Sequence, residues 1–127
     1  MMEMVRRLTP REVVRQDVEA IAGIYRNLGA SVAEQLVTRA LGELALSMAG
    51  IAELVNRQEL GDLARQLARL GRLAEDIGLI SLASVAGDAG QCLKRGDGTA
   101  FSAVWARLVR VAERSLSSDL GISDITL

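Results

Sequence analysis

The chain has 127 residues and a formal net charge of −1, and half of its residues are hydrophobic. This length suits one domain around one core, and the balanced charge argues against a general nucleic-acid binder, which carries a clear basic excess. No apolar run approaches the roughly 20 residues that a membrane span needs, and the N-terminus lacks the apolar segment of a signal peptide. We therefore expect a soluble, cytoplasmic protein that binds neither nucleic acid nor a membrane.

The first predicted helix covers about residues 10–28. Thr9 and Glu12 have the spacing of a capping box, and Pro10 between them is tolerated at the first helical position. Apolar residues then recur at helical spacing as far as Gly29, a typical residue at the end of a helix. This helix would precede the main bundle.

The second predicted helix, about residues 31–56, also begins with a capping pattern, formed by Ser31 and Glu34. Gly42 and Gly50 fall inside it. Each glycine costs about 1 kcal/mol relative to alanine in a helix, so the two indicate close packing or a bend.

The third predicted helix, about residues 59–77, has the clearest periodicity of the chain. Its apolar residues are spaced alternately three and four apart, which predicts a narrow buried seam: Leu60, Leu63, Leu67, Leu70, Ala74 and Ile77. The acidic pair Glu75 and Asp76 near its end points in directions about 100° apart, which is poorly suited to sharing a proton or a metal ion.

The last two predicted helices cover about residues 79–95 and 99–117, with a glycine-rich turn at 95–98 and a tail at 118–127. No strand pattern competes with them. The pattern predicts an all-α protein, namely an up-and-down antiparallel four-helix bundle with an additional N-terminal helix, in one domain spanning residues 1–127. In the fourth helix, Gly87 and Gly90 indicate either a close helix contact or a partner surface.

The residue types that usually carry catalysis are scarce. The chain contains no histidine, which removes the commonest general base and zinc ligand. Its one cysteine, Cys92, lies within the apolar spacing of the fourth helix and is expected to be buried and inert. We therefore expect no catalytic residue, no metal and no cofactor, and hence no enzyme.

Glu59 opens the third predicted helix, Ala68 follows nine residues later and Leu70 two residues after that, and a Gly-Asp turn at 96–97 ends the next helix. With this register, the stretch from Glu59 to Asp97 resembles a histidine phosphotransfer (HPt) domain. In that family an acidic residue opens the central helix, and the phospho-accepting histidine follows nine residues later within the motif H-x-L-K-G. Glu59 matches the acid, and Ala68 stands at the phosphohistidine position. Further matches follow in the same register: Leu70, Ala74, Ile77–Gly78, Leu82–Ala83 and Gly96–Asp97.

The departures from the HPt pattern fall at its reactive positions. Ala68 replaces the histidine, Gly71 the lysine and Arg72 the glycine. The resemblance thus implies an HPt-like fold in a degenerate member that cannot carry phosphate. Its partners would be the receiver domain of a response regulator or a histidine kinase.

The expected partner-binding face lies on the third helix. At about 100° per residue, Ala68 points well away from the leucine seam, and an arginine-flanked strip of small residues lies around it: Ala64, Arg65, Ala68, Arg69, Gly71 and Arg72. The resemblance implies that this face docks on the acidic active site of a receiver domain. Two other interpretations stay open: the arginines are an ordinary solvated face, or the small residues let another helix or subunit approach.

The alternative function is a structural or oligomerisation bundle that retains only the fold. Small residues on the second helix would then form a homodimer seam: Gly42, Ala45, Ala49 and Ala52. A ligand-binding bundle is a third alternative, which the small number of polar residues at inward positions disfavours.

Overall fold

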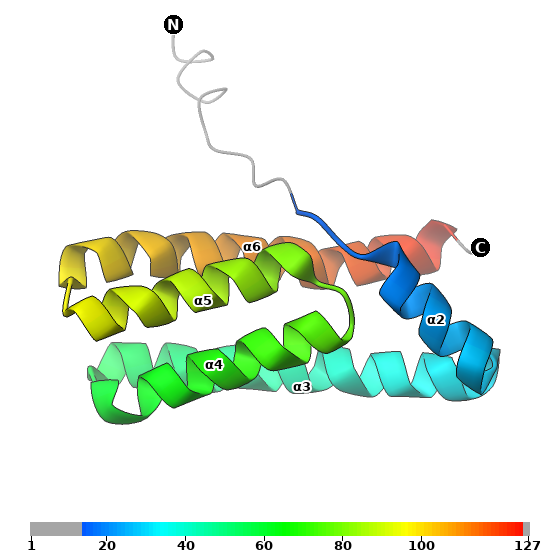
Figure 1. The fold of residues 1–127 in the computed structure, drawn as a ribbon, viewed down its shortest axis with the longest axis horizontal. Helices are drawn as coiled ribbons and strands as arrows, with labels where there is room; N and C mark the ends of the chain where they lie inside the picture. Colours follow the sequence, from blue (N-terminus) through cyan, green and yellow to red (C-terminus); the bar gives the residue numbers. More distant parts are fainter. Residues whose placement is uncertain (1–13, 126–127) are drawn as a thin grey trace, which may run out of the picture.

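The computed structural model describes the backbone of residues 14–125 and the side chains of residues 14–116. Within this part of the chain the structure consists of helices and short connections, without a strand (Figure 1), so the predicted all-α class is confirmed. The five described helices are α2 (Val18–Leu28), α3 (Ala30–Arg57), α4 (Leu60–Asp76), α5 (Ile80–Arg95) and α6 (Gly98–Ile125).

The first helix begins later than predicted. Residues 14–17 are not helical, and α2 starts at Val18 because Asp17 caps it: the Asp17 carboxylate accepts hydrogen bonds from the backbone N–H groups of Glu19 and Ala20, at 3.1 and 3.3 Å. The predicted start around residues 9–12 lies outside the described residues.

Two further boundaries differ from the prediction. Ser31 does not cap α3, because the connection from α2 is the single residue Gly29, with φ of +80°, and Ser31 already lies inside the first turn. At the other end, α6 continues through most of the predicted tail, to Ile125. No proline interrupts residues 118–125, and the helix propagates through them.

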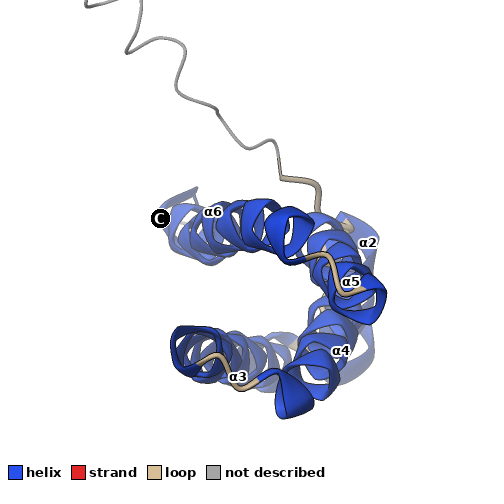
Figure 2. Cartoon of the chain, turned by 90° about the vertical axis from the view of Figure 1, so that its left-hand side faces the viewer, coloured by secondary structure: helices blue, strands red, loops and turns tan. Residues whose placement is uncertain are grey.

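Helices α3 to α6 run alternately up and down because two- and three-residue connections join them. Seen end on, they form an arc in the order α3, α4, α5, α6 (Figure 2), and contacts between α3 and α6 are few. The outer helices have 28 residues each, against 17 in α4 and 16 in α5. The short α2 packs on the part of α3 that extends beyond α4.

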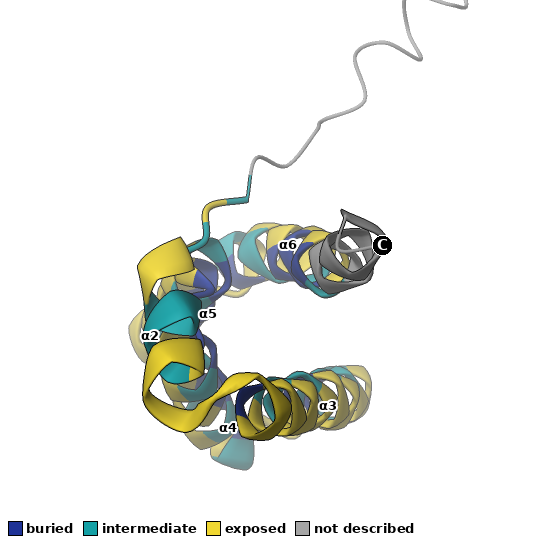
Figure 3. Ribbon diagram, turned by 90° about the vertical axis from the view of Figure 1, so that its right-hand side faces the viewer, coloured by how far each residue is buried: buried dark blue, intermediate teal, exposed yellow. Residues whose placement is uncertain are grey.

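The core lies along the inner side of the arc (Figure 3). It consists mainly of leucine, valine and alanine, and its largest fully buried apolar side chains are Leu44, Ile51, Leu63, Leu67, Leu70, Leu82, Val85, Leu108 and Val111. One member of the predicted buried seam of the third helix is exposed instead: Leu60, at 57%. Leu60 is the first residue of α4, so it lies at the end of the helix and of its buried face.

Candidate functional site

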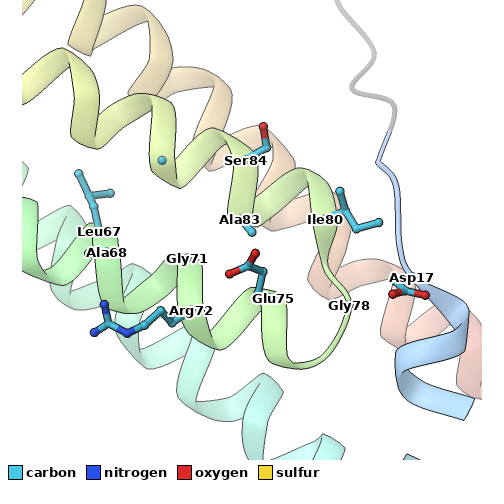
Figure 4. Close-up of a pocket in the computed structure, with 11 residues that line it drawn as sticks. Asp17, Leu67, Ala68, Gly71, Arg72, Glu75, Gly78, Ile80, Ala83 and Ser84 are labelled. Atoms are coloured by element: carbon cyan, nitrogen blue, oxygen red, sulfur yellow. The ribbon is translucent and has the colours of Figure 1, made fainter. Parts of the chain in front are cut away.

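A surface groove runs along the seam between α4 and α5, with a volume of about 540 Å³. Its centre is built from residues with little or no side chain. Ala68 and Gly71 on α4 lie opposite Ala83 on α5 (Figure 4), and Gly87 of α5 also lines the groove. The helices are close there, since a Cβ on Gly71 would lie 3.8 Å from the Ala83 carbonyl oxygen. We call this feature the α4–α5 groove.

The polar groups of the α4–α5 groove are few and of mixed charge. Arg72, Glu75 and Ser84 line its sides, and Asp17 lies at one end. In Figure 4 the Glu75 carboxylate points across toward α5, whereas Arg72 extends away from α5 along the outside of α4. The groove can therefore accept a mixed polar and apolar surface, and it holds no concentrated charge of one sign.

An extended segment closes the end of the groove near the α4–α5 turn. Asp17 donates a backbone hydrogen bond to the Gly78 carbonyl oxygen at 2.6 Å. Arg15 donates its N–H to the Ser81 hydroxyl at 2.7 Å, and the Ser81 N–H donates to the Arg15 carbonyl oxygen at 3.3 Å. These bonds attach residues 15–17 to the start of α5 and determine where α2 begins.

The six predicted partner-binding residues do not form one continuous face in the structure. Ala68, Gly71 and Arg72 line the α4–α5 groove. Ala64 is half-buried one turn before Ala68. Arg65 lies on the outer side of α4, where it pairs with Asp62, and Gln66 also donates to that carboxylate. The ion pair offsets the positive charge that Arg65 would add.

Arg69 faces a second groove, on the opposite side of α4. This α3–α4 groove has a volume of about 390 Å³, and its lining includes Glu43, Leu46 and Gly50 of α3. Neither Arg69 nor Arg72 has an ion-pair partner among the described residues. The two arginines are separated by only one helical turn and share the surface around Glu75 and Asp76.

Sequence reasoning missed the α5 side of the groove. Gly87 and Gly90 were interpreted as either a close helix contact or a partner surface, and a Cβ on either would meet nothing within 4 Å. The close helix contact is therefore excluded, and open space lies over both. The spacing of Ala83, Gly87 and Gly90, four and three residues apart, is the signal that could have indicated one smooth helix face.

The small residues of the predicted dimer seam on α3 lie at or near the surface. Gly42, Ala45 and Ala49 are exposed and Ala52 is half-buried, and a Cβ on Gly42 or Gly50 would meet nothing within 4 Å. The close packing expected at these two glycines is therefore absent from the described part of the chain.

Three further features of the described residues concern the single cysteine, metal binding and membrane spans. Cys92 is buried in the core, as predicted. No three histidine, cysteine or acidic residues come close enough to hold a metal ion in the described part of the chain. In the same part, every helix is too short or too polar to span a bilayer.

Comparison of the chain with protein-family models, with curated proteins and with solved structures finds no match. Any assignment of function therefore depends on the residues and on the geometry of the grooves.

Proposed function

We propose that the chain is a non-catalytic, HPt-like adaptor of cytoplasmic two-component signalling. It binds the receiver domain of a response regulator, or a histidine kinase, and carries no phosphate. One observation above all supports this proposal. Ala68, which stands where the HPt family has its phospho-accepting histidine, is exposed in the α4–α5 groove. A docking protein can reach it there.

The surroundings of Ala68 suit a protein partner better than a small molecule. The groove is open, and small residues on two antiparallel helices line its centre. Such low relief lets a broad surface approach the backbone closely, whereas small-molecule sites are concave and bury most of their ligand. Arg72 beside it has no ion-pair partner among the described residues and is available to an acidic partner.

Docking without phosphate transfer follows from the composition. The chain has no histidine at position 68 or elsewhere, so the phosphoryl chemistry of the HPt family has no acceptor. The adaptor would occupy the face that a receiver domain presents to phosphotransfer proteins. It would act by sequestering that domain or by competing with an active phosphotransfer protein.

The test is a binding titration of the purified chain with receiver domains and histidine kinases from the same organism. Arg72→Glu reverses the unpaired charge at the groove and should weaken binding by about tenfold or more. Arg65→Glu is the matched control on the same helix, because Arg65 lies outside the groove and already pairs with Asp62. The triple reversal of Arg65, Arg69 and Arg72 to Glu should abolish binding.

A second pair of variants tests the groove by shape. Ala68→Trp fills it and should block binding, whereas Ala106→Trp adds the same bulk to an exposed site on α6 and should leave binding unchanged. If no receiver or kinase binds the folded chain, or if Ala68→Trp binds as well as the wild type, the adaptor proposal is wrong. The alternative of a bundle that serves only oligomerisation would then be favoured.

A further inference from the structure

Helix α3 carries a second seam on its outer surface, distinct from the face that enters the core. Successive members are spaced alternately four and three residues apart, which places them on one side of a helix. The seam consists of Val32, Leu36, Arg39, Glu43, Leu46 and Gly50, and all six are exposed. We call it the outer α3 seam.

The apolar members of this seam are unusually accessible. Val32 is 52% exposed, Leu36 44% and Leu46 75%. At about 100° per residue, the seam centres about 110° from the mean direction of the buried Leu44 and Ile51. The exposed leucines are therefore not a poorly packed edge of the core. They belong to a separate stripe of the width that a single partner helix covers.

The seam is complementary to itself when reversed. Arg39 and Glu43 lie two residues on either side of position 41, Leu36 and Leu46 lie five residues away, and Val32 and Gly50 lie nine. A second α3 running antiparallel, with a two-fold axis at the level of position 41, would thus bring each residue to its counterpart. This reciprocity is what an isologous dimer interface requires.

We propose that the outer α3 seam binds a second copy of the chain in a two-fold symmetric, antiparallel homodimer. In it, Arg39 meets the partner's Glu43 twice, and Leu36 packs on the partner's Leu46 twice. Val32 fills the space over the partner's Gly50, where a Cβ would meet nothing within 4 Å of its own chain. The contact would extend over about 27 Å, at a rise of 1.5 Å per residue.

The charges favour this occupant over an unrelated apolar helix. Neither Arg39 nor Glu43 has an ion-pair partner among the described residues. In the antiparallel arrangement each Arg39 lies beside the partner's Glu43, which favours that arrangement. A parallel one would place Arg39 beside Arg39 and Glu43 beside Glu43, so repulsion between like charges disfavours it.

The homodimer does not depend on the proposed receiver binding. The seam borders the α3–α4 groove, which Glu43, Leu46 and Gly50 line together with Arg69. The α4–α5 groove around Ala68 lies on the other side of α4 and is lined by no residue of α3. A dimer would therefore cover the surroundings of Arg69 and leave both copies of the α4–α5 groove accessible.

Sedimentation equilibrium of the whole chain tests the dimer. The wild type should show a concentration-dependent mass that approaches twice the 13.6 kDa of one chain. Arg39→Glu and Glu43→Arg each place like charges across the axis and should raise the dimer dissociation constant by about tenfold or more. The double variant Arg39→Glu/Glu43→Arg restores opposite charges and should restore the dimer.

Two further variants test whether loss of the dimer is caused by the interface itself. One controls for loss of folding, and the other controls for changes in the α4–α5 groove. Leu46→Glu should abolish the dimer without loss of helicity, because Leu46 is 75% exposed in one chain. Arg72→Glu lies in the α4–α5 groove and should leave the dimer unchanged. A wild type that stays monomeric up to millimolar concentration overturns the proposal, as does a dimer that tolerates each single reversal or that the double reversal fails to restore.

Discussion

Asp17 and Gly78 hold the N-terminal segment against the turn between α4 and α5 through their backbones alone. The Asp17 N–H donates to the Gly78 carbonyl oxygen at 2.6 Å. A Cβ on Gly78 would lie only 2.5 Å from the Asp17 carbonyl oxygen, and Gly78 has a φ of +75°. Glycine is required here both for the backbone conformation and for the closeness of the second segment.

Gly78→Ala should therefore lower the free energy of unfolding by about 3 kcal/mol, since the left-handed conformation costs roughly 1–2 kcal/mol and the clash with Asp17 adds to it. Gly96→Ala is the matched control, because Gly96 has a φ of +68° but no atom within 4 Å of the added Cβ. Gly96→Ala should lower the free energy of unfolding only by the cost of the left-handed conformation, roughly 1–2 kcal/mol. Urea unfolding followed by the fluorescence of the single tryptophan, Trp105, measures both. Equal losses in the two variants would contradict the contact with Asp17.

Leu67 and Leu60 belong to the same predicted seam, but replacing each with alanine should change the free energy of unfolding by very different amounts. Leu67 is 1% exposed in the core, whereas Leu60 is 57% exposed at the start of α4. Leu67→Ala should cost about 2–5 kcal/mol, the range for truncation of a buried leucine, and Leu60→Ala less than about 1 kcal/mol. Thermal unfolding of the two variants checks the difference. A large loss at Leu60 would mean that another surface covers it in solution.

Ser115 is a buried polar residue whose hydroxyl has no hydrogen-bond partner among the described residues. Replacing it with alanine removes an unsatisfied group, so Ser115→Ala should raise the free energy of unfolding by about 1 kcal/mol or more. Ser102→Ala, at an exposed site on the same helix, gains only helix propensity, about 0.5 kcal/mol. Parallel urea titrations compare them, and a loss of stability in Ser115→Ala would show that the hydroxyl is satisfied in solution.

Gly87 tests whether α5 takes part in partner binding. Gly87→Leu should fill the α4–α5 groove from the α5 side and weaken binding of any receiver domain or histidine kinase that the wild-type chain binds. It should not lower stability, because a Cβ there meets nothing within 4 Å. Gly42→Leu makes the same change at an open site on α3 and should leave binding unaffected. Undiminished binding by a stably folded Gly87→Leu chain would confine docking to α4.

Much of the helical fold follows from local patterns. The leucine spacing of α4 predicts its buried face correctly from Leu63 to Ile77. The glycines at 29, 78 and 96 mark three helix ends, and each has a positive φ. Such patterns are readable because helix periodicity and the left-handed conformation depend on residues adjacent in the chain.

The start of α2 could not be predicted in the same way. The capping pattern at Thr9 predicts a helix through residues 14–17, yet Arg15 and Asp17 instead bond to Ser81 and Gly78. Those partners lie more than 60 residues away in the sequence. Hydrogen bonds between distant segments override a local preference that is worth only about 1 kcal/mol.

Local patterns in the sequence are enough to predict the helical class, the ends of α4 and α5 and the outward direction of Ala68, because short-range sterics and apolar periodicity decide each of them. The packing of the helices against one another adds three facts: Ala68 lies opposite α5, Arg65 and Arg69 lie outside its groove, and Leu36 and Leu46 stay uncovered. The physical reason is that periodicity specifies which side of a helix is buried. It does not specify which neighbour lies beside that helix, or how far along it that neighbour extends.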